Sequence, residues 1–489
     1  MLPRPESKEI DRKARLRVPA VVVPKQPPHA RVRNFDEVLL PWTATMATAE
    51  AARCLQCVDQ PCVKACPLGN DIPMALWLTE HGDFDGAVEV FQRTSNLSEV
   101  CGRICPQSEQ CEGACPHIKA GQPPVAVGRI ESFLADRFWG EKKWGLQRPP
   151  CSEHRVAVVG AGPAGLTVAE LLAKEGHCVT VFDQWPDGGG ILRYGIPRFK
   201  LDHSLVRKRL DCLRTLGVEF VFNTRIGNGK GVDDLFSTGF EAVFLGTGSG
   251  LPASGEVPGS DLHGVYQATP FLVRANVEQN LRPSELEDPP QVGNRVAVIG
   301  GGDTAMDCCR TALRLGADEV TCFYRRTEEE MPGNPRDRAL AREEGTESRW
   351  LVAPSRFLGD DRGQLQGMEC VRTILGPPDE SGRRRPEPVA GSEFQLQVDT
   401  VVMALGYRPD PALPGETRGL KAGKSGLLMT DPATGRTTKE MVWAGGDNVL
   451  GPSLVALAAA QGRVAALDIH RRLSWNSSGV GPGAGSWRG

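Results

Sequence analysis

Apolar residues follow a helical period along the first third of the chain and form short, continuous runs beyond it. Between residues 43 and 100 the spacing predicts several helices, and residues 125–139 continue the pattern. Residues 1–40 are rich in proline and charge and predict an extended arm. We therefore expect residues 1–150 to form a small helical domain.

After the Pro149–Pro150 pair the pattern changes to buried strands that alternate with helices. Apolar residues 156–160 lead into a glycine-rich turn, a helix and a second strand at 178–183. The same order returns between residues 295 and 326, so one β-α-β unit occurs twice. This alternation is typical of parallel α/β domains, and it predicts two Rossmann-like dinucleotide-binding domains.

Two polar segments are expected to lack regular structure. Residues 376–393 predict an exposed loop, in which the run Arg383–Arg385 is solvated. Residues 475–489 are of low complexity and predict a disordered tail.

Charge and hydropathy narrow the function classes. The 489 residues carry a formal net charge of −3, so no basic field that would bind nucleic acid or an anionic membrane is expected. No apolar run approaches the roughly 20 residues that span a bilayer, and the N-terminus lacks the apolar core of a secretory signal. We therefore expect a cytoplasmic protein.

Fifteen cysteines are present, and eight of them fall between residues 54 and 115. They follow the pattern C-x2-C-x4-C-x3-C-P and then C-x3-C-x5-C-x3-C-P. Structural zinc prefers compact C-x2-C pairs, whereas cysteine followed by proline occurs in ferredoxin runs. The pattern favours two [4Fe–4S] clusters over zinc or other thiol roles, and the remaining seven cysteines are expected to be small buried thiols. The candidate cysteine ligands are Cys54, Cys57, Cys62, Cys66, Cys101, Cys105, Cys111 and Cys115.

The first glycine-rich turn has the form of a dinucleotide-binding turn. Gly160 permits the tight turn, Gly162 allows the backbone to approach a pyrophosphate, and Gly165 allows the helix to pack closely on the strand. The helix that begins at Pro163-Ala164 would then offer free N–H groups to the phosphates. Asp183, at the end of the next strand, would accept hydrogen bonds from a ribose and repel a 2′-phosphate. The turn therefore predicts FAD or NAD(H), against the alternative of glycines that merely shape a turn.

The second turn differs from the first at the end of its second strand. Gly300, Gly302 and Ala305 repeat the spacing of the three glycines, but Arg325 and Arg326 follow the strand where the first copy has an acidic residue. Two guanidinium groups suit a 2′-phosphate through charge-assisted hydrogen bonds. The second turn therefore predicts NADP(H), against the alternative of an ordinary exposed strand end.

Several longer motifs carry a family resemblance. They are CLQC, CGRICPQSEQCEGACP, GAGPAG, GGILRYGIPRFKL, GGGDTAMDC, FYRRTEEEMPG, ALGYRP and AGGDNVLGPSLV. From about residue 30 to residue 473 the chain resembles the small (beta) subunit family of NADPH-dependent glutamate synthase. The same module resembles the N-terminal half of dihydropyrimidine dehydrogenase and the large subunit of NADH-dependent ferredoxin:NADP oxidoreductase.

The resemblance implies an α/β flavoprotein of the adrenodoxin reductase, two-dinucleotide-domain type, with nested domains. FAD would occupy a discontinuous domain, 151–250 and 407–474, and NADPH an inserted domain, 251–406. Further residues implied to line FAD are Gly189, Gly190, Lys200, Thr247, Gly248, Gly446, Asp447, Ser453 and Leu454. Those implied to contact NADPH are Gly300, Gly302, Asp303, Thr304, Ala305, Arg325, Arg326 and Gly406. Pro452 replaces a small residue of the family pattern near the flavin.

The resemblance also implies how the cluster ligands are shared. One cluster would take Cys54, Cys57, Cys62 and Cys115, and the other Cys66, Cys105 and Cys111. Its remaining ligand is either Cys101 or the carboxylate Glu131, which the dehydrogenase resemblance favours.

The resemblance implies an electron-input enzyme of glutamate biosynthesis. NADPH would reduce FAD by hydride transfer, and the clusters would pass single electrons to a glutamate synthase large (alpha) subunit or another electron-accepting flavoprotein or ferredoxin, in a hetero-oligomer. The cofactors carry this chemistry, so no catalytic side chain is expected. The alternatives are a ferredoxin-linked transhydrogenase subunit and, from another class, a zinc-stabilised interaction module without enzyme activity.

Overall fold

Capping side chains begin the helices of the N-terminal region, as its hydrophobic spacing predicts. In the computed structural model, which describes residues 3–5, 10–140, 147–253, 257–378, 382 and 384–478, Thr43, Asp71 and Asp83 each accept a hydrogen bond from the first turn of the helix that follows. This helical unit contains α1 (Arg12–Arg15), α2 (Pro28–Arg31), α3 (Ala44–Ala51), α4 (Pro61–Ala65), α5 (Ile72–Glu80), α6 (Phe84–Gln92), α7 (Ser98–Ile104) and α8 (Val127–Gly140). The helix predicted over residues 125–139 is α8.

The first β-α-β unit is part of a parallel five-stranded sheet, in the order β16-β4-β1-β2-β3. Its elements are β1 (Arg155–Val159), α9 (Pro163–Lys174), β2 (Cys178–Phe182), α10 (Ile191–Tyr194), α11 (His203–Thr215), β3 (Glu219–Val221), α12 (Val232–Ser237), β4 (Ala242–Leu245), β16 (Val442–Ala444), α17 (Asp447–Leu450) and α18 (Val455–Ser478). Strand β16 pairs with β4, so the chain returns to this sheet after a long excursion. We call this region the first sheet unit.

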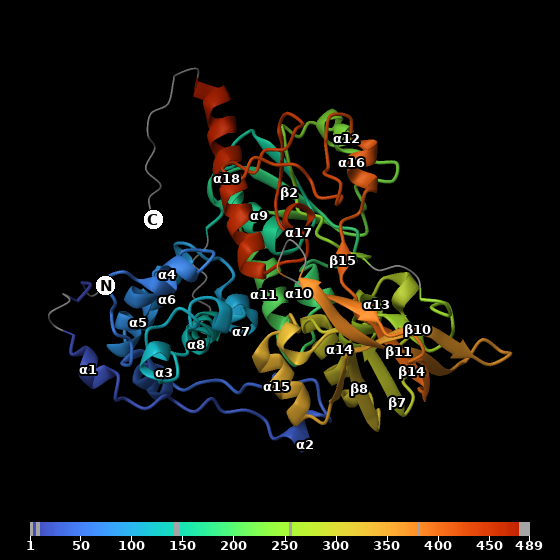
Figure 1. Ribbon diagram of the computed structural model, residues 1–489. Coiled ribbons are helices and arrows are strands. Elements are labelled where there is room, and N and C mark those ends of the chain that lie inside the picture. Colours follow the sequence, from blue (N-terminus) through green and yellow to red (C-terminus); the bar gives the residue numbers. More distant parts are fainter. Residues whose placement is uncertain are drawn as a thin grey trace.

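The excursion forms a second parallel sheet, in the order β6-β14-β7-β8-β9. Its elements are β6 (Val265–Gln267), α13 (Ala268–Asn276), β7 (Arg295–Ile299), α14 (Asp303–Arg314), β8 (Glu319–Tyr324), α15 (Pro335–Glu343), β9 (Glu347–Trp350) and β14 (Thr400–Met403). Two short strands, β5 (Leu251–Pro252) and β15 (Tyr407–Arg408), pair where the chain enters and leaves this second sheet unit. The nested arrangement of two Rossmann-like domains is confirmed (Figure 1).

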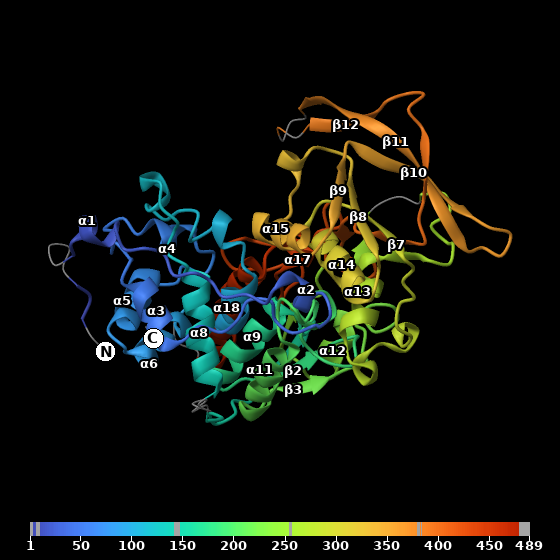
Figure 2. The ribbon, with the colours of Figure 1, turned by 90° about the horizontal axis from the view of Figure 1, so that it is seen from below.

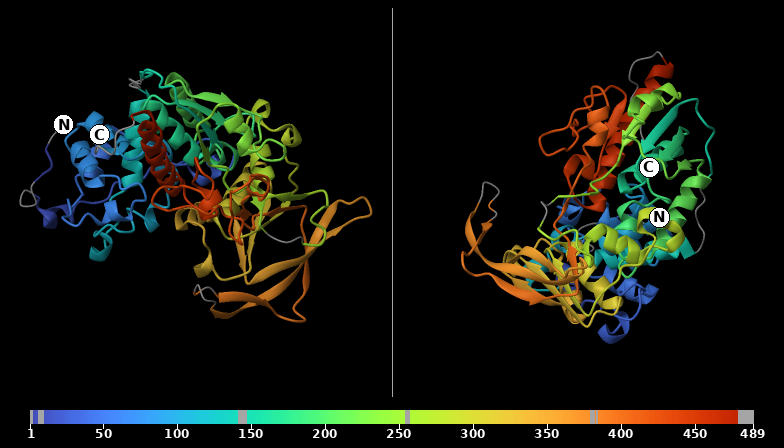
Figure 3. Two further views of the ribbon diagram at one scale, coloured as in Figure 1. Left: turned by 90° about the horizontal axis from the view of Figure 1, so that it is seen from above. Right: turned by 90° about the vertical axis from the view of Figure 1, so that its right-hand side faces the viewer.

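An antiparallel sheet extends from the second sheet unit and projects away from the helical unit (Figures 2 and 3). It contains β10 (Val352–Gly359), β11 (Leu365–Pro378), β12 (Arg384–Pro388) and β13 (Phe394–Gln397). The predicted loop at 376–393 is therefore partly wrong, since β11 and β12 pair within it. Regular alternation is weak there, which is why the hydrophobic pattern missed the hairpin.

Two further expectations differ from the structure at single sites. Cys151 is exposed and forms a disulfide with Cys178, so these two are not the buried thiols that the sequence predicts. Helix α18 continues to Ser478, inside the predicted tail, and residues 479–489 lie outside the described residues. No helix in the described part of the chain is long and apolar enough to cross a membrane.

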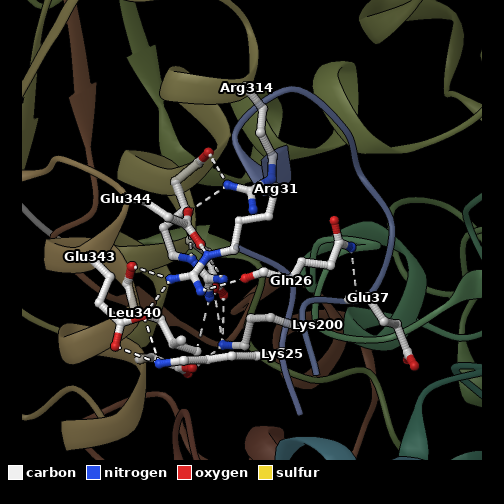
Figure 4. Close-up of polar contacts among 12 residues, drawn as sticks. Lys25, Gln26, Arg31, Glu37, Lys200, Arg314, Leu340, Glu343 and Glu344 are labelled. Carbon is white, nitrogen blue, oxygen red and sulfur yellow. Dashed lines mark hydrogen bonds and ion pairs between the residues drawn. The ribbon is translucent and has the colours of Figure 1, made fainter. Parts of the chain in front are cut away.

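The N-terminal arm ties the helical unit to the second sheet unit. It passes from α1 to α2 beside α15 (Figure 1). Arg31 is fully buried there and donates hydrogen bonds to Glu344, to Glu343 and to the carbonyl of Leu340, while Lys25 forms an ion pair with Glu343 (Figure 4). The two regions are therefore joined by a buried polar contact as well as by the chain.

Candidate functional site

Four of the predicted cluster ligands lie close together in the helical unit. Burial, together with the neighbouring thiols of Cys57 and Cys115, raises the pKa of the Cys54 and Cys62 thiols to about 12. Cys57 is half-exposed and also interacts with Cys115. The structure thus brings together the set Cys54, Cys57, Cys62 and Cys115, which we call the outer cysteine group.

The remaining candidates form a second set on the side of the first sheet unit. The pKa of Cys101 is raised by its hydrogen bond with Cys105 and by burial. Partial burial of Cys66 and the burial of Cys111 raise the pKa of both thiols, and both interact with the carboxylate of Glu131. We call these five residues the inner cysteine group. Cys101 and Glu131 both belong to it, so either can complete the set of ligands.

The inner and outer groups have the chemistry that an iron–sulfur cluster needs. Burial raises the pKa of Glu131 to about 8, and its Oε1 has no hydrogen-bond partner among the described residues. Uncompensated buried carboxylate and thiol groups are stabilised by metal coordination. No three or more Cys, His, Asp or Glu side chains in the described segments are arranged as a metal site. The fit of the two groups to iron–sulfur clusters therefore rests on the chemistry of their thiols and carboxylate.

Two arginines of the arm hold the loop that carries the first cysteines. Arg12 donates to the carbonyl oxygens of Leu55 and Gln56 at 3.0 and 3.1 Å, and Arg15 donates to that of Cys54 at 3.0 Å. Gln56 has a φ of 46°, so its backbone is left-handed and benefits from such support. Sequence reasoning missed these two residues, because they are about 40 positions away from the loop.

The first glycine turn lies at the carboxyl edge of the first sheet, as expected. A Cβ on Gly160 would lie 2.3 Å from the carbonyl oxygen of Gly246, and one on Gly165 would lie 1.9 Å from that of Gly160. Each of these two positions therefore requires glycine. Gly162 precedes α9 without any side-chain cap, and a Cβ there would meet nothing within 4 Å. The free N–H groups and open space at this helix end suit a pyrophosphate.

Asp183 has a contact that the sequence did not predict. Its Oδ2 accepts a hydrogen bond from the Ala161 N–H at 2.7 Å, and its Oδ1 accepts one from the Trp185 N–H at 2.9 Å. Burial raises the pKa of Asp183 to about 6. The carboxylate thus braces the glycine turn, and its contact with a ribose stays a prediction.

Other residues predicted to line FAD gather around this turn. A Cβ on Gly190 would lie 2.8 Å from Gly162 Cα, and one on Gly446 would lie 3.2 Å from Ala164 Cβ. Asp447 accepts hydrogen bonds from the backbone and the hydroxyl of Ser453 at 3.1 and 2.9 Å. Gly189 lies against the turn, because its N–H donates to Ala161 O at 2.8 Å. Thr247 and Gly248 follow β4, and Leu454 directly precedes α18. The pieces come from distant parts of the chain.

The second glycine turn repeats this geometry with one addition. A Cβ on Gly300 would lie 2.3 Å from the Ala404 carbonyl oxygen, and α14 begins at Gly302 without a side-chain cap. The loop before α15 folds back over the turn, where Gly333 N donates to Gly301 O at 3.0 Å and Asn334 N donates to Asp303 Oδ1 at 2.7 Å. The motif FYRRTEEEMPG includes part of this loop, but the sequence alone did not predict its contact with the turn. Thr304 and Ala305 lie in the first turn of α14, and Gly406 lies beside β5.

The two predicted phosphate-binding arginines differ in exposure. Arg325 is exposed at the end of β8, whereas Arg326 is buried and donates from Nε to the Arg384 carbonyl oxygen at 2.8 Å. Arg384 itself donates to the carbonyl oxygens of Leu375 and Gly376. The expectation that its run of arginines is solvated agrees with the exposure of Arg384 and Arg385, and Arg383 lies outside the described residues.

Lys200 links the two sheet units. Its Nζ lies 3.0 Å from Asp307 on α14 and 2.7 Å from Asp337 on α15. These carboxylates raise the pKa of the lysine although burial opposes its charge. The predicted contact of Lys200 with FAD stays a prediction, and the observed role is an ion-paired joint between the units.

Comparison with known proteins agrees with this geometry. Residues 31–143 match the family described as dihydropyrimidine dehydrogenase domain II, 4Fe–4S cluster, and residues 154–462 match the pyridine nucleotide-disulphide oxidoreductase family. The chain is 41% identical over 454 residues to the glutamate synthase [NADPH] small chain of Escherichia coli (strain K12), covering 91% of this chain and 95% of the relative.

Two other similar proteins extend the comparison. The putative oxidoreductase AegA of the same organism is 42% identical over 452 residues, covering 90% of this chain and 68% of the relative. The structure of Mycobacterium tuberculosis FprA in complex with NADPH has a TM-score of 0.55 at 20% identity, covering 68% of this chain and 86% of that one, and shows the shared fold. The chain therefore belongs to the glutamate synthase small-chain family of oxidoreductases, in which an iron–sulfur domain precedes a pyridine nucleotide-disulphide oxidoreductase fold.

Proposed function

We propose that this oxidoreductase takes electrons from NADPH at the second sheet unit and delivers them, through FAD in the first sheet unit and two [4Fe–4S] clusters in the helical unit, to a partner protein. The proposal assigns residues 1–150 to the cluster domain, 151–250 with 407–474 to the FAD domain, and 251–406 to the NADPH domain. When bound, FAD accepts a hydride and the clusters carry single electrons.

One observation carries this order. Cys101 and Cys105 of the inner group belong to the same apolar core as Ala164 and Val168 of α9, next to the first glycine turn. Cys54, Cys62 and Cys115 of the outer group pack in the separate core of the helical unit, which the inner group reaches through Cys111 and Cys66. The inner group therefore lies between the proposed flavin site and the outer group.

In this proposal, electrons leave the protein for its partner from the outer cysteine group. Val58, next to half-exposed Cys57, is 81% exposed, which is unusual for a large apolar side chain beside a buried site. We propose the large subunit of glutamate synthase as the partner, in a cytoplasmic hetero-oligomer, because the family relatives carry that name. AegA is equally similar, so a different acceptor in a longer oxidoreductase is the second candidate.

Chemical analysis of the purified, anaerobically prepared protein tests the assignment. We expect iron, acid-labile sulfide, FAD and no zinc, and we expect Cys66→Ala to remove the inner cluster while Cys57→Ala removes only the outer one. Electron paramagnetic resonance of the reduced variants distinguishes the two clusters. Zinc without sulfide, or the same cluster lost in both variants, would contradict the proposal. Co-purification of an amidotransferase subunit would identify the glutamate synthase partner.

A further inference from the structure

A small, partly open cavity lies where four parts of the molecule meet. Its volume is about 30 Å³, which exceeds the roughly 10–15 Å³ that one water molecule needs. The arm contributes Glu37, α7 and α8 contribute Arg103 and Arg129, and α14 and α15 contribute Arg310 and Arg336. The cavity is distinct from both cysteine groups and from both glycine turns.

The lining of this cavity is strongly cationic. Three of its cations have carboxylate partners: Arg103 pairs with Glu37 and Asp136, Lys200 with Asp307 and Asp337, and Arg310 with Glu344. The other two cations, Arg129 and Arg336, form no ion pair within 4.0 Å in the described part of the chain.

Their contacts are with neutral groups. Arg129 donates to the carbonyl oxygen of Leu40 at 2.8 Å, and Arg336 donates to Gln107 and to the carbonyl oxygen of Arg103. A carbonyl oxygen satisfies a donor without neutralising its charge, and the carboxylates that interact with Arg129 (Glu37 and Asp136) and with Arg336 (Glu112 and Asp337) do so without a direct ion pair.

Two donors on the lining arginines also lack acceptors. Arg129 is 9% exposed and Arg310 is 0% exposed, yet Nε of the first and Nη1 of the second have no hydrogen-bond partner among the described residues. The closest ion-pair contact of Arg310 Nη1 is Asp337 Oδ1 at 3.9 Å, beyond hydrogen-bond distance. Burial and the neighbouring Arg103 lower the pKa of Arg129 to about 10, although Glu37 and Asp136 act in the opposite direction.

We propose that the cavity binds a small inorganic anion of chloride size. Such an ion accepts hydrogen bonds from the unpaired donors of Arg129 and Arg310 and balances the charge of Arg129 and Arg336. Water could accept the same hydrogen bonds but would not supply the direct negative contact that Arg129 and Arg336 lack within 4.0 Å among the described residues. Because the lining comes from the arm, the helical unit and both sheet units, a bound anion would stabilise their junction.

Bromide provides a direct probe of this site. Crystals of the full-length holoprotein, soaked in sodium bromide, should show an anomalous scattering peak within the cavity beside Arg129 and Arg310. In solution, replacing gluconate by chloride at equal ionic strength should raise the thermal midpoint of the holoprotein by about 2 °C, since gluconate is too large for the cavity.

Matched variants separate this site from general salt effects. Arg129→Gln and Arg336→Gln should each abolish the chloride-dependent rise, and either suffices if the other fails to fold. Arg338→Gln serves as the control, because Arg338 on α15 also has an unpartnered Nε in the described structure but does not line the cavity. A cavity filled only with water, or a chloride effect that persists in both cavity variants, would overturn the proposal.

Discussion

The two sheet units share a β-α-β arrangement but differ in the residues that follow the second strand. In each unit a glycine follows the first strand, and its N–H donates to the carbonyl of a residue at the end of the second strand. The donor is Gly160 and the acceptor Phe182 in the first unit, and they are Gly300 and Phe323 in the second. One residue further on, the first unit has Asp183 and the second has Tyr324, followed by exposed Arg325. Asp183 braces its own turn, whereas the ring of Tyr324 packs against Gly301.

The comparison supports our proposal that the backbone forms the phosphate site and that the residues at the strand end select the ligand. Uncapped helix ends at Gly162 and Gly302 are common to both units and suit any dinucleotide. A carboxylate beside the first turn disfavours a 2′-phosphate, and a free guanidinium beside the second favours it. Four substitutions test this division, and they are given in order of expected effect.

The largest effect is expected at the joint between the units. Lys200→Met would leave Asp307 and Asp337 buried without their shared counter-charge. Removing one member of a buried ion pair costs about 3–5 kcal/mol, so we expect the free energy of unfolding to fall by that amount in denaturant titrations. Lys424→Met, at an exposed position, is the control and should change little. A similar loss in both variants would contradict the role of the joint.

A reciprocal exchange at the third glycine position compares the two helix packings. Gly165→Ala places a methyl group 1.9 Å from a backbone oxygen, so we expect a loss of about 3 kcal/mol and weakened flavin retention. The second unit already has Ala305 there, and Ala305→Gly should cost only about 1 kcal/mol. Thermal unfolding and flavin content measure both. Equal losses would show that the two helices pack alike.

Removing the exposed guanidinium should affect one nucleotide selectively. Arg325→Ala deletes a charge-assisted contact to the 2′-phosphate, so KM for NADPH should rise by about 10-fold while KM for NADH stays constant. Arg325 is the better target than Arg326, because Arg326 also anchors β12. Steady-state reduction of ferricyanide gives both constants. An equal rise for NADH would contradict a 2′-phosphate contact.

The smallest effect concerns the pH dependence of Asp183. Burial raises its folded pKa to about 6, above the ordinary value of about 3.9, so the folded state holds the proton more tightly and stability falls as pH rises through this window. Between pH 5 and pH 7 we expect the native protein to lose about 1 kcal/mol relative to Asp183→Asn. Urea unfolding at the two pH values measures the difference, and parallel curves would rule out this titration.

Local features of the molecule were predictable from the sequence, and long-range contacts were not. The duplicated turns, the helical N-terminal unit and the nested sheets follow from residue spacing and from family motifs that are contiguous in the chain. The brace from Asp183 to Ala161, the pairing of Lys200 with Asp307 and Asp337, and the support of the Cys54 loop by Arg12 depend on folded geometry across tens of residues. No pattern of hydrophobic positions encodes such pairings.

The cysteine groups were predictable only in part. Spacing indicated iron–sulfur ligands, but only the family resemblance predicted that Cys66 separates from Cys54 and joins Cys105. In the structure Cys66 and Cys111 interact with Glu131, whereas Cys54 interacts with Cys57, Cys62 and Cys115. The assignment of each residue to a cluster stays a prediction. Cys101 and Glu131 lie in the same group, so their roles require the metal analysis described above.

The central claim is that the first unit binds the flavin and the second binds NADPH. An anaerobic titration of the purified protein with NADPH, followed by visible absorbance, tests it most directly when repeated on Arg325→Ala. We predict that a stoichiometric amount of NADPH bleaches the flavin absorbance of both proteins, that Arg325→Ala is reduced about 10-fold more slowly at the same subsaturating NADPH concentration, and that the flavin content of the two is equal. An unchanged spectrum, or a loss of flavin in Arg325→Ala, would contradict this division of ligands.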